Sequence, residues 1–188
     1  MTKKNIELTA MPTPNPNSIK FLINAHLLES GSIDFSSKEK AKGSPLIETL
    51  FSISGICGVM IGTNFISISK ESQAGWETVL EDATNTIKTM LKNEDLLIKK
   101  ELIEALKEKN EEDSDTVKKI KEILDNEIRP AIAMDGGDCQ FIGFEDGIVR
   151  LELQGACSSC PSAVMTLKMG IENRLKEDIP EVEEVIQV

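Results

Sequence analysis

Residues 128–162 read IRPAIAMDGGDCQFIGFEDGIVRLELQGACSSCPS, and this stretch organises the C-terminal part of the chain. The Gly136-Gly137 pair ends a helix, because glycine readily takes the left-handed backbone conformation that closes helix C-termini. Cys139–Phe144 and Ile148–Leu153 are β-prone runs, and the Asp146-Gly147 pair between them suits a tight hairpin turn. The stretch therefore predicts a helix end, a hairpin and a following loop that carries two cysteines.

Apolar residues at helical spacing place one helix before this hairpin and another after it. Ser114 or Asp115 is a possible cap of the first helix. The apolar positions are Val117, Ile120, Ile123, Leu124, Ile128 and Ile132 in the first helix and Val164, Leu167, Ile171 and Leu175 in the second. A last strand around Val182–Val188 completes the order α-β-β-α-β.

The first third of the chain also reads as a mixture of strands and helices. Ser18–Asn24 is a short apolar run, as expected of a strand. Ser44-Pro45 opens a helix, with serine as cap and proline at the first helical position. Cys57–Ile61 and Phe65–Ser69 form a second candidate hairpin, and a further helix starts at Gly75. These elements are enough for one small α/β core.

An acidic segment separates the two parts. Residues 93–116 hold four basic and nine acidic side chains, and Lys107–Asp115 contains no apolar residue. Such a composition is typical of a solvated linker. We therefore predict an α+β protein of two small α/β domains, residues 1–92 and 116–188, joined by an acidic, partly helical linker at 93–115.

Composition and charge exclude several classes of function. The formal net charge is −11, and an acidic chain is unsuited to nucleic acid, because binding to phosphates needs clustered Lys and Arg. No apolar run approaches the ~18 to 20 residues that cross a bilayer, so no membrane association is expected. Met1–Thr9 has neither an apolar signal core nor the arginines of a transit peptide, which predicts a cytoplasmic protein. In a reducing cytosol, four cysteines are more often thiols or metal ligands than disulfides.

The Cys157-Ser-Ser-Cys160-Pro161 loop is the one constellation with evident chemistry. Two sulfurs separated by two residues can reach a single metal centre. Pro161 fits the first position of a helix, so Cys160 would lie at a helix N-terminus. The free N–H groups and the helix dipole there stabilise the thiolate, which is the form that binds iron or zinc.

This pair supplies only half of a tetrathiolate site, and several readings stay open at this point. If neither Cys57 nor Cys139 joins, a second chain provides the other two ligands, and a two-fold dimer then holds one shared metal centre. A thiol-disulfide oxidoreductase would use the same pair, yet the pair follows a hairpin instead of the first strand of a βαβ unit. A zinc-binding adaptor needs two further ligands, and the chain has no second C-x-x-C and no pair of histidines.

Several short motifs carry a resemblance to a known family. Residues 128–188 resemble the C-terminal domain of the NifU family, the Nfu-type iron-sulfur cluster scaffold proteins. Residues 11–91, with TPNPNSIKF, SPLIETLF and GWETVL, resemble the N-terminal domain of two-domain Nfu proteins. The C-terminal motifs are Arg129-Pro130, Asp135-Gly136-Gly137-Asp138, Gly155–Pro161 (GACSSCP), Leu167-Lys168, Gly170-Ile171-Glu172 and Ile179-Pro180-Glu181-Val182.

The resemblance implies a scaffold or carrier of a 4Fe-4S iron-sulfur cluster. It implies that Cys157 and Cys160 are the cluster-binding and metal-binding residues, with the cluster shared between the subunits of a homodimer. Expected partners are upstream cluster-assembly proteins and apo iron-sulfur proteins as clients. No enzymatic role is expected, since the sequence shows no phosphate loop and no arrangement of a nucleophile with histidine.

Other candidate residues have plainer interpretations. Cys57 and Cys139 lie in apolar runs and are predicted to be small buried hydrophobes; a ligand role for Cys139 is doubtful, because that position is usually apolar in the family it resembles. His26, the only histidine, is excluded as a ligand. Lys168 is expected to face water. Asp135–Asp138 falls short of a calcium site and is interpreted as a helix stop with a turn.

Overall fold

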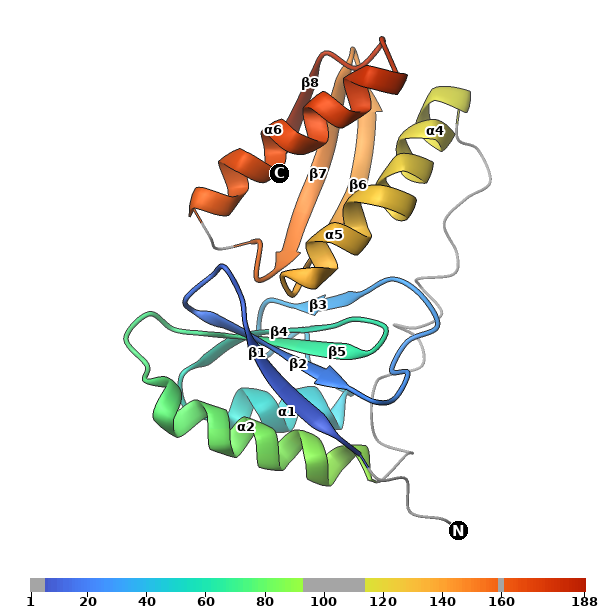
Figure 1. Ribbon diagram of the computed structural model, residues 1–188. Coiled ribbons are helices and arrows are strands. Elements are labelled where there is room, and N and C mark those ends of the chain that lie inside the picture. The colour runs from blue at the N-terminus through green and yellow to red at the C-terminus, as the bar shows by residue number, and fades with distance from the viewer. Residues whose placement is uncertain (1–5, 93–113, 159–160) are drawn as a thin grey trace. The chain divides into compact units, whose positions relative to one another are not determined.

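The computed structural model describes residues 6–92, 114–158 and 161–188, without the side chains of residues 161–164. The chain divides into two compact units, Met1–Lys109 and Asn110–Val188. Each unit has its own sheet and its own hydrophobic core (Figure 1). The predicted α+β class with two domains is therefore confirmed. Most of the linker predicted at 93–115 lies outside the described residues, so its helical part and the domain boundaries stay predictions.

The N-terminal unit is built on a five-stranded antiparallel sheet in the order β1-β2-β5-β4-β3. The predicted hairpin between the fourth and fifth strands is present. Sequence analysis missed both edge strands; the first of them ends at Pro12, and an edge strand tolerates proline because its N–H group need not join the ladder. The strands are β1 (Leu8–Pro12), β2 (Ser18–Ile23), β3 (Ile33–Phe35), β4 (Ile56–Ile61) and β5 (Phe65–Lys70).

Two helices, α1 (Pro45–Ser52) and α2 (Trp76–Leu91), cover one face of this sheet (Figure 1). Both were predicted. Every fourth residue of α2 from Val79 to Leu91 is buried, which is the spacing that turns one helix face to a core. Pro45 occupies the first turn of α1 as expected, but the Ser44 side chain makes no capping hydrogen bond there.

The C-terminal unit begins with an uninterrupted helical stretch: α4 (Asp115–Ile123), a π-helical turn η2 (Leu124–Ile128) and α5 (Arg129–Met134). The predicted cap is present, since Ser114 Oγ accepts a hydrogen bond from Val117 N. The π-turn was not predicted. It directly precedes Pro130, which has no N–H group to donate to the preceding turn and whose ring would crowd the carbonyl four residues earlier.

The sheet of this unit has three strands in the order β6-β7-β8, namely β6 (Gly137–Glu145), β7 (Ile148–Gly155) and β8 (Glu184–Gln187). The first two form the predicted hairpin, and positive φ angles at Asp146 and Gly147 match a primed turn. Helix α6 (Pro161–Asp178) leads from β7 to β8, which run parallel. The predicted order α-β-β-α-β is confirmed.

Alternate residues of β7 face the core of the C-terminal unit. Val149, Leu151 and Leu153 are buried and share one hydrophobic cluster with Ile171 and Leu175 of α6. That cluster continues to Cys157, so the cysteine loop is attached to a packed core. In the part of the chain that the structure describes, no helix combines the length and the apolar character needed to span a bilayer.

Candidate functional site

The cysteine loop starts with a tight turn at the end of β7. Gly155 has a φ angle of 61°, a left-handed conformation that favours glycine. Its carbonyl accepts hydrogen bonds from the backbone N of Ser158 at 3.2 Å and from the Ser158 hydroxyl at 2.9 Å. The Cys157 backbone N donates to the Gln154 carbonyl at 3.4 Å. These bonds fold the chain back at the point where Cys157 leaves the sheet.

The Cys157 sulfur lies against the backbone of Gly137, the first residue of β6. A Cβ atom built at Gly137 would lie 2.4 Å from the Cys157 sulfur, closer than real atoms approach. Gly137 pairs with Gly155 across the hairpin, so the sulfur occupies room left by a missing side chain. Cys157 is only 5% exposed in this chain. We call this arrangement the sulfur seat.

Gly136 ends helix α5, whereas its neighbour Gly137 makes room for the Cys157 sulfur. The φ angle of Gly136 is 76°, and its backbone N donates to the Ala133 carbonyl at 3.0 Å, which ends α5 as predicted. Its carbonyl accepts a hydrogen bond from Ala156 N at 3.1 Å. The helix end is thereby tied directly to the residue before Cys157. Since the Ala156 N–H donates to Gly136, it is not directed at the cysteine sulfurs.

An ion pair with a buried carboxylate stabilises the start of β6. Arg129 Nε and one of its terminal nitrogens donate to the two carboxylate oxygens of Asp138 at 2.8 and 2.7 Å. The Asp138 side chain is 8% exposed, and it also accepts a hydrogen bond from Cys139 N at 2.8 Å. The bond to Asp138 raises the pKa of Arg129. The pair therefore links α5 to the strand that forms the sulfur seat.

Cys139 is buried, as predicted. Burial, followed by the charge of Asp138, raises the pKa of the Cys139 thiol to about 12. A thiol with such a pKa stays protonated near neutral pH, whereas a metal ligand must lose its proton. Cys139 belongs to the same hydrophobic cluster as Leu153 and Cys157, so its side chain packs like that of an apolar residue.

The prediction for Cys57 is wrong, because this residue is exposed. It lies in the N-terminal unit, where the pairing of β4 with β5 shifts register between Ile56 and Gly58. Such a bulge leaves one residue without a partner on the neighbouring strand and breaks the alternation of faces. The alternation of apolar residues in the sequence cannot reveal a bulge, so Cys57 was assigned to the core.

Two other predicted surface residues can be placed. His26 is exposed. Lys168 does not simply face water, since its ammonium group lies 3.0 Å from the Glu184 carboxylate. This ion pair joins α6 to β8 at the surface of the unit.

Cys160 lies outside the described residues, so the structure places only one member of the predicted pair. The following helix begins at Pro161, as the sequence predicted. Within the described ranges, no group of three or more His, Cys, Asp or Glu side chains is arranged to hold a metal ion.

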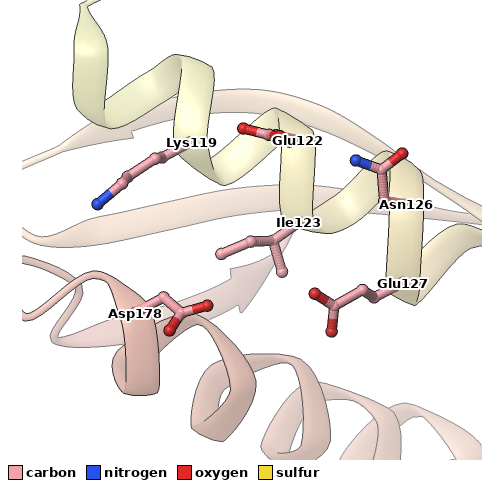
Figure 2. Close-up of a pocket in the computed structure, with 6 residues that line it drawn as sticks. All are labelled: Lys119, Glu122, Ile123, Asn126, Glu127 and Asp178. Atoms are coloured by element: carbon pink, nitrogen blue, oxygen red, sulfur yellow. The ribbon is translucent and has the colours of Figure 1, made fainter.

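A pocket of about 300 Å³ lies away from the cysteine loop and is lined by Lys119, Glu122, Ile123, Asn126, Glu127 and Asp178 (Figure 2). Its carboxylates Glu127 and Asp178 are paired with Arg174 at 2.7 and 2.8 Å. It borders the last residue of α6, whose 18 residues span about 27 Å from the loop end. Two of its three carboxylates are paired with Arg174, and Lys119 lines the same pocket, so the pocket offers no evident cation site.

The sequence analysis missed Arg129, Gly137 and Asp138 as parts of the site. It treated Asp138 as one end of a turn, assigned Gly137 only to a helix stop, and cited Arg129 only within a motif. The predicted hairpin turn alone could not have found the seat, because its register would place Gly137 opposite Ala156. A bulge between Phe141 and Gly143 shifts the pairing so that Gly137 lies opposite Gly155.

Comparisons with known proteins match both units. A family described as "NifU-like domain" matches residues 120–186, and one described as "Scaffold protein Nfu/NifU N terminal" matches residues 8–94. A protein of Drosophila ananassae, "NFU1 iron-sulfur cluster scaffold homolog, mitochondrial", is 43% identical over 98% of this chain and 65% of its own length. The protein of the same name from Drosophila virilis is 41% identical over 100% of this chain and 63% of its own.

One solved structure is also similar. The solution NMR structure of a NifU-like protein from Saccharomyces cerevisiae has 25% identity and a TM-score of 0.47, covering 53% of this chain and 90% of that one. The chain spans about 65% of the length of the first curated relative.

The relatives correct one prediction. Both Drosophila proteins are named mitochondrial, so the cytoplasmic location predicted from Met1–Thr9 is wrong by this comparison. The cytoplasmic location was inferred only from the composition of the nine residues Met1–Thr9. Cellular location is determined by targeting signals that receptors recognise. The charge and packing of the folded domains do not reveal such a signal.

Proposed function

Since the chain belongs to the NifU/Nfu family of iron-sulfur cluster scaffold proteins, we propose that it holds a 4Fe-4S cluster through Cys157 and Cys160 and transfers it to apo-proteins. The cluster is cargo in this proposal, received from an upstream assembly protein and delivered to a client. The protein itself makes and breaks only iron-sulfur ligand bonds.

The observation that carries the proposal is the sulfur seat. Cys157 is held by the Gly137 contact and by the turn at Gly155, and a ligand held in one position before a cluster arrives supports this proposal. Cys160 directly precedes Pro161, the first residue of that helix. A helix N-terminus favours a thiolate over a thiol, because unpaired N–H groups and the helix dipole stabilise the negative charge.

The remaining ligands come from a second copy of the chain. A cluster of this type takes four cysteine ligands, and the loop provides two. Cys139 is a poor candidate, because it lies on β6 and is only 2% exposed in the hydrophobic core. Cys57 belongs to the other unit and lies on a strand of its sheet. A homodimer with the cluster on its two-fold axis then completes the coordination.

Anaerobic reconstitution with ferrous iron and sulfide tests the proposal. We expect a brown protein with broad visible absorbance, about four irons per dimer, and loss of the colour from the donor when an apo-protein that needs a 4Fe-4S cluster is added. A colourless product that instead reduces insulin disulfides would favour a thiol-disulfide oxidoreductase and contradict the proposal.

Gly137→Ala is a sharper test of the seat. The added Cβ would meet the Cys157 sulfur at 2.4 Å and must displace it. Overpacking of a core typically costs about 1–3 kcal/mol, so we expect cluster occupancy to fall by roughly tenfold at limiting iron. Iron per chain after gel filtration is the measurement.

Gly143→Ala is the matched control, because this glycine lies on the same strand and a Cβ there meets nothing within 4 Å. It should hold iron like the unchanged protein. Equal retention by both variants would show that the Gly137 contact does not position the ligand.

A further inference from the structure

Helix α6 exposes two methionines near the cysteine loop. Met165 is 65% and Met169 is 58% exposed, and their spacing of four residues puts them on one face. The opposite face packs into the core through Ile171 and Leu175. Large apolar side chains that stay in water are the informative exceptions on a folded surface.

The apolar character of this exposed face is confined to the end of the helix next to the loop. After Met169, the exposed positions of the helix are Gly170, Asn173, Lys176, Glu177 and Asp178, so its exposed side becomes polar toward the far end. Met165 is only five residues beyond Cys160. We call Met165 and Met169 the methionine face.

The charges around the methionine face are compatible with a contact between two copies of the chain. Two chains of net charge −11 repel each other, so a contact must avoid unpaired acids. The charged residues beside the methionine face are paired within the chain. Lys168 bonds to Glu184 at 3.0 Å, and Lys176 bonds to Glu172 at 2.6 Å. The face can therefore meet its own copy without bringing unpaired charges together.

We infer that the methionine face is the contact surface between two copies of this chain when they share a cluster. This inference rests on the proposed function, since four thiolates from two loops around one cluster bring the two loops, and with them the first turns of both α6 helices, to the same place. The sulfur-containing side chains can adapt to a surface that forms and separates repeatedly.

The methionine face is too small to hold a permanent dimer by itself. A stable protein interface buries roughly 800 Å² on each partner, whereas exposed patches on monomers are about 300–600 Å² at most. Two methionine side chains per chain cannot hold a permanent dimer. The cluster must therefore supply the rest of the binding, and we expect the cluster-free protein to be monomeric.

The double variant Met165→Glu, Met169→Glu tests the inference. Four added carboxylates would face one another in the dimer, so we expect at least a tenfold loss of iron per chain after anaerobic reconstitution, with a monomeric mass by light scattering. Met165→Leu with Met169→Leu keeps the apolar surface and should retain both the iron and the dimer. Met11→Glu places the same charge on an exposed methionine of the N-terminal unit and should also retain them.

The outcomes separate the inference from the proposed function. The circular dichroism melting curve of the cluster-free glutamate variant should match that of the unchanged protein, because both side chains are solvent-exposed. A glutamate variant that stays dimeric with about four irons overturns the inference, and slower transfer by such a dimer would assign the face to a client instead. If the unchanged protein itself retains no cluster, the proposed function fails.

Discussion

Alanine at Cys157 or at Cys160 is expected to abolish iron retention after anaerobic reconstitution. Each substitution removes one ligand from every chain and therefore two of the four from a shared cluster. Water or buffer thiols cannot hold the remaining half of the coordination sphere through gel filtration. Iron and acid-labile sulfide per chain, together with visible absorbance, measure the loss.

Cys57→Ala is the matched control for these variants. Cys57 is exposed in the N-terminal unit, so the substitution leaves both the C-terminal core and the cluster ligands intact. This variant should keep full iron content and colour. A Cys157→Ala protein that still holds about four irons per dimer would remove the basis of the proposed function.

Arg129→Met is expected to lower the free energy of unfolding of the C-terminal unit by about 3 kcal/mol, because it removes the cation that pairs with the buried Asp138 carboxylate. The Asp138 carboxylate, 8% exposed, would lose two hydrogen bonds and keep the one from Cys139 N. The start of β6 and the sulfur seat should loosen together, so cluster retention should fall as well.

Urea unfolding followed by two signals localises this effect. Trp76 is the only tryptophan and lies in the N-terminal unit, so its fluorescence reports that unit, whereas far-ultraviolet circular dichroism reports both. We expect Arg129→Met to shift only the circular dichroism transition.

Arg174→Met provides the comparison at the surface. Arg174 also donates two hydrogen bonds to one carboxylate, that of Glu127, but Glu127 is 48% exposed. Exposed ion pairs contribute little to stability, so this variant should unfold close to the unchanged protein. Equal losses in the two variants would mean that burial of Asp138 does not determine the strength of its pairing.

Local features of the C-terminal unit could be predicted well. The helix stop at Gly136 and the primed turn at Asp146-Gly147 depend on the conformations open to a few adjacent residues. The helix cap at Ser114 and the helix start at Pro161 are equally local. The two edge strands of the N-terminal sheet were missed, because short strands with little alternation are defined by their neighbours.

By itself, the sequence determined the order of helices and strands in the C-terminal unit, the cysteine pair and its place before a helix, because each depends on residues close together in the chain. Only the tertiary structure decided that Gly137 seats the Cys157 sulfur, that Arg129 pairs with Asp138 and that Cys57 is exposed. These features depend on strand register, on a bulge and on packing between segments far apart in the chain. Such relations exist only once hydrogen bonding and burial have fixed the fold.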